Sequence, residues 1–474
     1  MNQEEIFQVI IRHTQEVLPG LEQHPFQHSD QLQDLGANSV DRAEIVMLVL
    51  DSLSLKIPRN WRTCYMRNSA QREPVITGVG VTSAIGQSQG NFIRALLGAE
   101  SSFGVMQRPG RQRDSAFLGA EIASLQIPAE IARQTLRRAS FSTQVALSTL
   151  HEAWHDARLN EVDPARIGLI VGGSNIQQRD LVLAHDAYAT RSEFLSPTYG
   201  VSFMDTDLCG FCTEQFGIRG LAYTVGGASA SGQLAIIQAI QAVQTGQVDT
   251  CIALGALMDL SFWECQGLRN LGAMGSDRYA QEPALACRPF DRNRDGFIYG
   301  ECCGVVVVEA ATAAQQRAVK PYAWLSGWGL VMDAQQNPNP SVDGEVKAMQ
   351  MALHRAACTP ESIDYINPHG TGAPLGDETE LKAIHACQLS HAYLNTTKSI
   401  IGHGLSAAGT VEVVATLLQM QAGRLHPSRN LDHPIDPSLN WVRQHSVAHS
   451  VDTALTLSMG FGGINTALCL RRYD

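Results

Sequence analysis

The feature that most constrains the fold is an alternation of short apolar strands and helices, which runs once along the chain and then begins again. From Pro74 the order is strand-like VITGVGVTS, helix-like FSTQVALSTLHEAWHDA and strand-like RIGLIVGGSN, and the apolar CCGVVVVEAA closes the series. After Lys320–Pro321 the series restarts with AWLSGWGLV and ends with ALTLSMGFGGINTALCL. Such an alternation predicts an α/β body in which helices cover sheets. The restart predicts two duplicated halves, residues 74–318 and 319–474.

The first part of the chain differs from this body in charge. Residues 1–58 carry nine Asp or Glu and three Lys or Arg, which is six of the eleven net negative charges. The stretch RNWRTCYMRNSAQR that follows carries four Arg and no acid. Because a shift of this kind marks a domain boundary, we expect an acidic, all-α segment over 1–58 and an Arg-rich linker over 59–73.

Bulk properties exclude several function classes. A net charge of −11 argues against a nucleic-acid partner. No apolar run reaches the roughly 18 residues of a membrane helix, and the acidic start lacks the order of a signal peptide. Of the eleven cysteines, only Cys209 and Cys212 form a CxxC pair, which has no second pair or histidine at zinc spacing. We therefore expect no metal site and a cytoplasmic protein with reduced thiols.

Ser39 lies at the predicted start of a helix in the acidic segment, and two interpretations remain open. It follows the turn residues Gly36 and Asn38 in LGANSVDRAEIVMLVL. In the first interpretation, Ser39 is an N-cap of this helix and has no further role. Alternatively, since free N–H groups and the helix dipole stabilise phosphate at a helix N-terminus, its hydroxyl can carry a phosphodiester. Asp41, Glu44 and Asp51 would then offer an acidic docking face to basic partners.

The body of the chain holds five residues with the potential for chemistry. Ser229 stands at the tip of the small-residue turn VGGASASGQ, which opens onto an apolar helix. His369 follows a predicted strand in NPHGTGAP, and His403 precedes a helix, with Lys398 five residues upstream in the strand-like LNTTKSI. Phe461 lies among the glycines of SMGFGGINTA, where backbone can approach a ligand closely. Each histidine alone fits a structural or a catalytic role, and both lie at strand-to-loop junctions, where catalytic side chains gather.

Taken together, these stretches resemble a β-ketoacyl synthase of the thiolase superfamily over about residues 74–474. The motifs are ITGVGVTSAIG, RPFDRNRDGFIYGE, HGTGAPLGDETE, TTKSIIGH and GFGGIN. The resemblance implies a thiolase-like fold of two duplicated αβαβα halves. It also implies that His369 and His403 are the catalytic histidines, that Lys398 organises them, and that the backbone N–H of Phe461 helps to form an oxyanion hole. Glu301 and Asp377 match structural acids of the family.

The sequence departs from the family at the nucleophile. The family reads A-C-[AS]-S-G, whereas here Ala228-Ser229-Ala230-Ser231-Gly232 places serine on the cysteine position. A cysteine thiol has a pKa of about 8.5 and ionises further at a helix N-terminus, but a serine hydroxyl does not, so acyl loading should fall by orders of magnitude. Decarboxylation needs only donors to the developing enolate, each worth roughly 3–4 kcal/mol. The expected activity is therefore decarboxylation of malonyl-acyl carrier protein to acetyl-acyl carrier protein.

Ser39 and its surroundings resemble an acyl carrier protein. LGANSVDRAEI matches the attachment motif in its N-S form, which is found in donor carriers of polyketide β-branching cassettes, and this implies 4′-phosphopantetheine on Ser39 or on a separate carrier. The carrier-like pattern ends near Pro58, before the fourth helix of such domains. The implied partners are a malonyl-loaded acyl carrier protein, a hydroxymethylglutaryl-CoA-synthase-like enzyme, other polyketide synthase components and a second copy of the chain. Two alternatives remain: a β-ketoacyl synthase or acyltransferase with Ser229 as nucleophile, and a non-catalytic partner like a chain-length factor.

Overall fold

The structure is a computed structural model that divides into two compact units, Met1–Gln71 and Arg72–Asp474. It describes residues 3–18, 20, 21, 24–28, 30–32, 35, 45, 46, 48, 49, 52, 53, 72–113 and 115–473. In the first unit, α1 (Gln3–Val17) is an amphipathic helix, and His13 Nε2 lies 2.7 Å from the hydroxyl of Ser52. Ser39 lies outside the described residues, so its modification stays a prediction.

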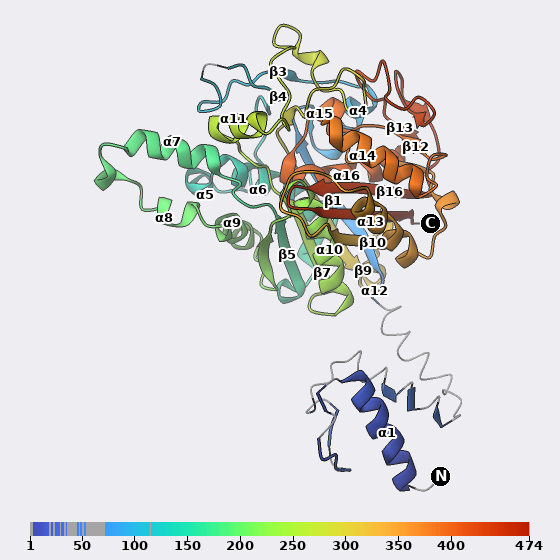
Figure 1. Ribbon diagram of the computed structural model, residues 1–474. Coiled ribbons are helices and arrows are strands. Elements are labelled where there is room, and N and C mark those ends of the chain that lie inside the picture. Colours follow the sequence, from blue (N-terminus) through green and yellow to red (C-terminus); the bar gives the residue numbers. More distant parts are fainter. Residues whose placement is uncertain are drawn as a thin grey trace. The chain divides into compact units, whose positions relative to one another are not determined.

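The first half of the second unit forms five neighbouring strands of one sheet (Figure 1). Their order across the sheet is β6-β5-β7-β9-β1. Strand β9 is antiparallel to both of its neighbours, whereas β5 runs parallel to β6 and β7. The strands are β1 (Pro74–Ser83), β5 (Ile167–Gly172), β6 (Ala222–Val225), β7 (Thr250–Gly255) and β9 (Cys302–Ala310).

The second half repeats this arrangement strand for strand. The order is β12-β11-β16-β17-β10, and β17 is antiparallel to both neighbours, as β9 is in the first half. The two halves join where β1 pairs with β10, through Val75↔Trp324 and Ile76↔Ala323. The predicted α/β fold with a duplicated unit is confirmed. The strands are β10 (Ala323–Met332), β11 (Tyr365–Asn367), β12 (Tyr393–Leu394), β16 (Thr453–Gly460) and β17 (Ile464–Arg472), and β14 (Asn440–Trp441) extends the edge at β12.

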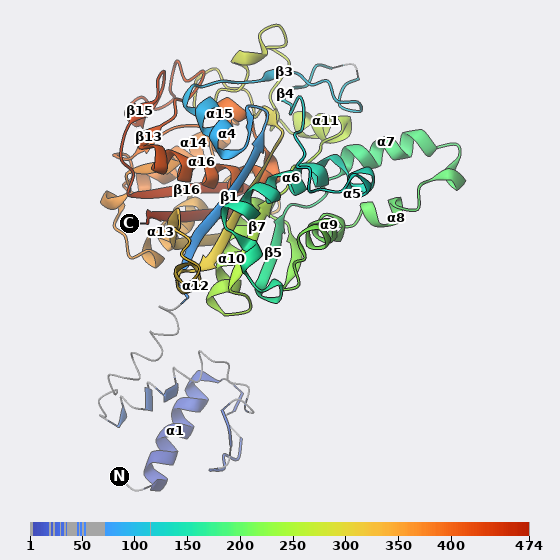
Figure 2. The ribbon, with the colours of Figure 1, turned by 180° about the vertical axis from the view of Figure 1, so that it is seen from behind.

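Helices cover the sheet in layers. In the first half α6 (Phe141–Asp156) packs on β1 and β9, as Figure 2 shows from behind, and α9 (Thr206–Phe216) packs on β5 and β6. In the second half α13 (Val342–Arg355) packs on β10 and β17, and α14 (Pro374–Ala386) packs on α13. Between the halves, α10 (Ser231–Gln244) and α16 (Ala408–Ala422) contact each other and strands of both halves.

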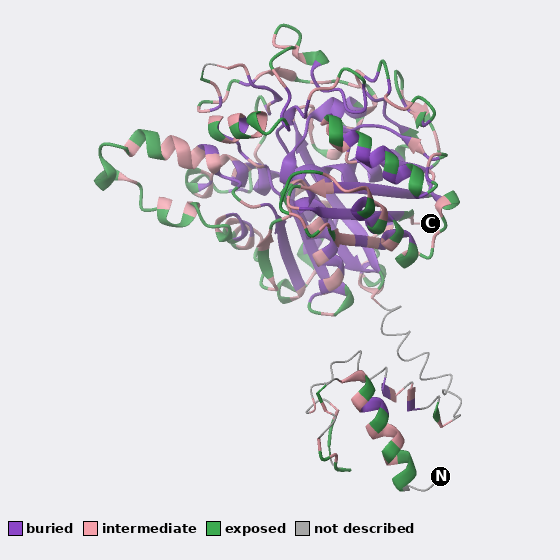
Figure 3. Ribbon diagram, viewed as in Figure 1, coloured by how far each residue is buried: buried purple, intermediate pink, exposed green. Residues whose placement is uncertain are grey.

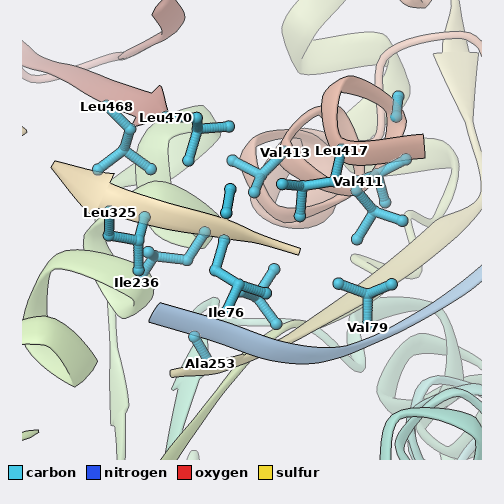
Figure 4. Packing of buried hydrophobic residues seen from close by; sticks show 14 of the residues in the cluster. Ile76, Val79, Ile236, Ala253, Leu325, Val411, Val413, Leu417, Leu468 and Leu470 are labelled. Carbon is cyan, nitrogen blue, oxygen red and sulfur yellow. The ribbon is translucent and has the colours of Figure 1, made fainter. Parts of the chain in front are cut away.

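The two central helices lie in the core because they are apolar on nearly every face. The strands beneath them are buried throughout (Figure 3). Glycines bring α16 close to the sheet, since a Cβ at Gly255 would lie 2.1 Å from the Thr410 hydroxyl. Figure 4 shows side chains of α10, α16, β1 and β17 packed together, among them Ile236, Val411, Leu417, Ile76 and Leu468. The position of α10 and α16 therefore fixes the loops that precede them.

The remaining elements lie at the periphery or in connections. They are α4 (Gln89–Leu97), α5 (Arg133–Arg138), α7 (Gln178–Tyr188), α8 (Tyr199–Ser202), α11 (Phe262–Asn270), α12 (Ala311–Gln316), β2 (Gly86–Gln87), β3 (Phe103–Val105), β4 (Leu118–Ala120), β8 (Tyr299–Gly300), β13 (Arg424–Leu425) and β15 (Val447–Ala448). Among the described helices, none is both long and apolar enough to cross a bilayer.

The strand-like assignment of LNTTKSI is wrong beyond its first residue. Strand β12 ends at Leu394, and Lys398 begins the short helix α15 (Lys398–Ile401). The intervening side chains hydrogen-bond to neighbouring segments, because Asn395 Nδ2 donates to Gln419 Oε1 at 2.9 Å and Thr397 Oγ1 accepts from Asn367 at 2.9 Å. Polar side chains that bond in this way compete with a strand ladder.

Candidate active site

The turn that carries Ser229 is held in one conformation by its small residues. It connects β6 to α10 through a short 3-10 helix, Ala228–Ala230, and Ala228 adopts a φ of +47°. Ser231 Oγ donates to Ala228 O at 2.7 Å and accepts from Gly227 N at 2.9 Å. A Cβ at Gly232 would lie 2.8 Å from the backbone of α16. Ser229 is consequently presented, half-buried, at the N-terminus of α10.

His403 faces Ser229 from the second half of the molecule. Its Nε2 lies 2.9 Å from Ser229 Oγ. The residue is buried, its backbone N–H donates to Ile298 O at 2.7 Å, and its ring meets the ring of Phe297 edge-on at 5.2 Å. Nδ1 has no hydrogen-bond partner among the described residues. Because a buried N–H without an acceptor is rarer than a bare lone pair, we assign the proton of the neutral ring to Nε2.

His369 lies beside His403, and its backbone is anchored from two directions. The two imidazole centroids are 5.5 Å apart with their planes at 84°. The backbone N–H of His369 donates to Glu380 Oε1 at 2.5 Å, and its carbonyl accepts from Lys398 Nζ at 2.5 Å. Although this backbone is fixed, Nδ1 of the ring has no partner among the described residues. Nδ1 of the ring can therefore form a hydrogen bond with a ligand.

Lys398 forms a buried ion pair beneath the histidines. Its Nζ lies 2.5 Å from Glu412 Oε1, and both side chains are almost fully buried. Burial raises the pKa of the Glu412 carboxyl to about 7, and the adjacent ammonium opposes that rise. Burial also lowers the pKa of His369 and of His403 well below the usual range, and the charge of Lys398 adds to the effect. Both imidazoles are therefore neutral at pH 7, and each can donate one N–H.

A cavity of about 470 Å³ opens onto these groups. Ser229, His369 and His403 line it, and Phe461 stands at its rim with 44% of its surface exposed. No described hydrogen bond uses the backbone N–H of Phe461. Lys398 does not line the cavity and acts on it only through the His369 carbonyl. Four of the predicted site residues are thus brought together around one cavity, and the fifth lies behind them.

Four acidic residues lie on the otherwise mostly apolar wall of the cavity. Asp333, Glu345, Asp377 and Glu380 contribute to it, and no Lys or Arg is among its described lining residues. Glu380 accepts backbone N–H groups on both oxygens, from His369 at 2.5 Å and from Gly370 at 2.8 Å. An anion that enters this cavity therefore meets no Lys or Arg among the lining residues that the structure describes.

Four other residues named from sequence occupy structural positions in the described chain. Glu301 is buried against Arg108 and Arg111. Asp377 accepts the backbone N–H groups of Phe290 at 2.6 Å and Gly372 at 3.1 Å. Cys209 and Cys212 are buried among apolar side chains on α9. No cluster of three or more metal-binding side chains occurs within the part of the chain that the structure describes.

Three buried acids at or behind the cavity escaped the sequence analysis. Glu412 is the single acid in the apolar helix α16, and a lone charge in such a helix signals a buried partner. Glu380 lies one turn after Asp377 in the GDETE motif, so their proximity was readable from helical spacing. Glu345 is on the face of α13 that also carries the buried Ala348 and Met349. An acid at helical spacing from apolar core residues is the signal that would have found it.

Comparison with known proteins places these features in a family. Residues 72–314 match the family "Beta-ketoacyl synthase, N-terminal domain", and residues 322–432 match "Beta-ketoacyl synthase, C-terminal domain". The polyketide biosynthesis malonyl-ACP decarboxylase PksF of Bacillus subtilis (strain 168) is 61% identical over 402 residues, which span 85% of this chain and 97% of PksF.

Solved structures agree with this assignment. A β-ketoacyl synthase from Burkholderia phymatum STM815 superposes with a TM-score of 0.76 at 27% identity, over 85% of this chain and all of that one. The AntDE:AntF complex, a type II PKS acyl-carrier protein with its ketosynthase, gives a TM-score of 0.73 at 25% identity over the same shares. These matches confirm the thiolase-like fold that the sequence predicts.

Proposed function

This chain belongs to the β-ketoacyl synthase family, and we propose that it decarboxylates malonyl-acyl carrier protein to acetyl-acyl carrier protein instead of condensing acyl chains. The observation that carries the proposal is the arrangement of Ser229, His369 and His403, in which two neutral imidazoles face a cavity that lacks the family cysteine. The name of PksF describes the same activity in a protein that shares 61% of the aligned residues.

The two histidines supply what decarboxylation requires. When the malonyl thioester enters, its carbonyl oxygen accepts the N–H groups of His369 and His403. The electrons of the breaking carbon–carbon bond then move toward that oxygen, which gains the negative charge of an enolate. Donors already in place stabilise this charge without reorganisation, each by roughly 3–4 kcal/mol. Their low pKa keeps them neutral, so they bind the oxygen without first protonating it.

The cavity also disfavours the substrate carboxylate. A carboxylate that leaves water for a site without a cationic partner is destabilised. The lining residues that the structure describes include four acids and no Lys or Arg. Departure as neutral CO2 removes the unfavourable charge. Because no acyl group waits on a cysteine, the enolate carbon takes a proton, and the product is an acetyl thioester.

A second candidate function is acyl transfer or condensation with Ser229 as the nucleophile. The distance of 2.9 Å between Ser229 Oγ and His403 Nε2 favours it, because an activated serine needs a base within this reach. With the proton on Nε2, however, His403 donates to the hydroxyl and offers it no lone pair. Such a base is normally oriented by a third group. Nδ1 of His403 has no partner among the described residues, so the pair lacks that support, and decarboxylation remains the better-supported function.

The proposal is tested by mass spectrometry of a malonyl-loaded carrier after incubation with the protein. We expect loss of CO2 to give acetyl-carrier. His369→Ala and His403→Ala should each lower kcat by roughly 100- to 1,000-fold, while the exposed His391→Ala serves as a control. Intact malonyl groups on every carrier tested, together with extension of acyl chains, would refute the proposal and favour Ser229 as the nucleophile.

We place this reaction in polyketide β-branching, where a hydroxymethylglutaryl-CoA-synthase-like enzyme would consume the acetyl group. The name of PksF supports a role in polyketide biosynthesis. The carrier would be recognised through 4′-phosphopantetheine, held on Ser39 or on a separate carrier protein. The ten described cysteines are free thiols, which fits the cytoplasm.

We further propose that two copies associate through the edge of the sheet. Among the strands that the structure describes, β6 pairs with β5 alone, and Tyr223 on β6 is 39% exposed. Thr224 Oγ1 donates to Asp205 O at 2.7 Å, which ties this edge to a segment with exposed apolar side chains, including Phe194 and Phe203. An open strand edge beside exposed apolar residues is a surface that a second copy can cover.

A further inference from the structure

Glu345 is a buried acid with no role in the mechanism so far. It lies in the first turn of α13, is 1% exposed, and belongs to the wall of the cavity that Ser229, His369 and His403 line. Its Oε2 atom has no hydrogen-bond partner among the described residues. A carboxyl group that is buried beside a ligand cavity without a partner calls for an explanation.

The groups around Glu345 leave the proton on this residue. Glu380 on α14 and Asp333 after β10 are the charged groups that face it, and β17 contributes only the neutral Asn465. Glu380 accepts two backbone N–H groups, and Asp333 accepts from Asn465 at 2.9 Å. Since like charges at close range cannot all ionise, the acid without donors retains its proton. Burial, followed by the charges of Glu380 and Asp333, raises the pKa of Glu345 well above its usual range.

The other ionisable groups that the structure describes here already have partners. Both oxygens of Glu380 and both oxygens of Asp377 accept backbone N–H groups. The N–H groups of His369 and His403 are committed to the enolate oxygen in the proposed mechanism. Lys398 is bound to Glu412 and to the His369 carbonyl. Glu345 is thus the described acid on the cavity wall whose carboxyl proton can be given to a substrate without breaking a hydrogen bond.

We propose that Glu345 is the acid that protonates the enolate carbon, a role that rests on the proposed decarboxylase function. After CO2 departs, the electron pair on the enolate carbon takes the proton of the Glu345 carboxyl group. The carbon–hydrogen bond of the acetyl group forms, the oxygen–hydrogen bond of Glu345 breaks, and Glu345 is left as a carboxylate. It recovers a proton from water after the product leaves.

This role has a consequence that is independent of CO2 release. By microscopic reversibility, the group that gives a proton to the enolate also removes one from the acetyl thioester. The protein should therefore exchange the methyl hydrogens of acetyl-carrier with solvent. If Glu345 only supported the fold, its carboxyl group would not exchange these methyl hydrogens with solvent.

The test measures deuterium in acetyl-carrier by mass spectrometry, after incubation in D2O with the full-length protein. We expect labelling above the protein-free rate, and a loss of roughly 100-fold or more in Glu345→Gln, since a positioned acid or base contributes about 10²- to 10⁴-fold. Asp343→Asn is the matched control, because Asp343 lies in the same helical turn but is exposed. Glu345→Ala with added formate should recover part of the exchange.

The outcomes separate this inference from the function beneath it. If the parent protein leaves malonyl-carrier intact, the decarboxylase function fails and the role of Glu345 falls with it. If the parent decarboxylates but does not label acetyl-carrier, or if folded Glu345→Gln labels it at the parental rate, only the role of Glu345 is overturned. The role of Glu345 is supported if Asp343→Asn labels acetyl-carrier at the rate of the parent protein while Glu345→Gln loses this labelling.

Discussion

Replacing Ser229 with alanine separates the two candidate reactions by the size of its effect. In the decarboxylase mechanism the Ser229 hydroxyl takes no part in bond making, and it only contacts His403 Nε2 at 2.9 Å before substrate arrives. Its removal deletes one hydrogen bond between uncharged groups. The Cα and Cβ atoms remain, so the turn before α10 should keep its conformation.

The expected magnitude follows from that single contact. A hydrogen bond of this type is worth about 0.5–1.5 kcal/mol net, and 1.36 kcal/mol corresponds to a factor of ten in rate. The decarboxylation kcat of Ser229→Ala should therefore change by about 2- to 13-fold. If Ser229 were the nucleophile, removal of its oxygen would lower kcat by about 10⁶, as it does in subtilisin.

The assay follows the rate of malonyl loss and acetyl gain on a carrier by mass spectrometry, at saturating substrate. Thermal unfolding of parent and variant establishes that Ser229→Ala is folded. A loss beyond about 1,000-fold in a folded variant lies far outside one neutral hydrogen bond and would refute the reasoning. A covalent acyl adduct on Ser229 of the parent protein would point the same way.

Three further predictions concern other parts of the chain. Ser39→Ala should abolish a 4′-phosphopantetheine mass shift after treatment with a transferase; absence of the shift in the parent would contradict the carrier assignment. Tyr223→Glu should lower the solution mass of a dimer toward that of a monomer, whereas Leu285→Glu, at a similar exposure of 38%, should not. A dimer unaffected by Tyr223→Glu would place the interface elsewhere. Because the folded-state pKa of Glu345 is raised, its proton stabilises the fold at low pH, and that contribution is lost as pH rises above about 4.3. The unfolding temperature of Glu345→Gln should fall less steeply with rising pH than that of the parent protein. An equally steep fall in both proteins would contradict the raised pKa of Glu345.

Much of the fold was predictable because each strand of the body is a compact apolar run. The runs at Pro74–Ser83 and Cys302–Ala310 became central strands with every residue buried. The connection between β5 and β6 was not predicted, although it contains α7, α8 and α9. Helix α7 has only one buried residue, Arg179, so it carries a weak apolar pattern. Lys398 was placed on a strand because the polar network around Asn395 has no local sequence signal.

The residues of the candidate site that lie in sequence motifs were predictable. The residues that reach the site only through tertiary contacts were not. Ser229, His369 and His403 stand at turns whose glycines and small residues are visible in the sequence. The cavity roles of Glu345 and Glu380 depend on α13 packing against α14, which no local pattern reveals. Glu345, Asp377 and Glu380 become buried on one wall only when the helices of the second half pack together.

Because the two halves have the same strand order, the positions of Ser229 and His403 in them can be compared. Ser229 follows the third strand of its half and precedes the central helix α10, and His403 follows the third strand of the other half and precedes the central helix α16. They occupy corresponding loops of a repeated unit. Because the two loops are separate segments of one chain, each can change without the other. Exchange of sulfur for oxygen in the first loop therefore removes the cysteine nucleophile of the family, while the imidazole of His403 in the second loop stays in place.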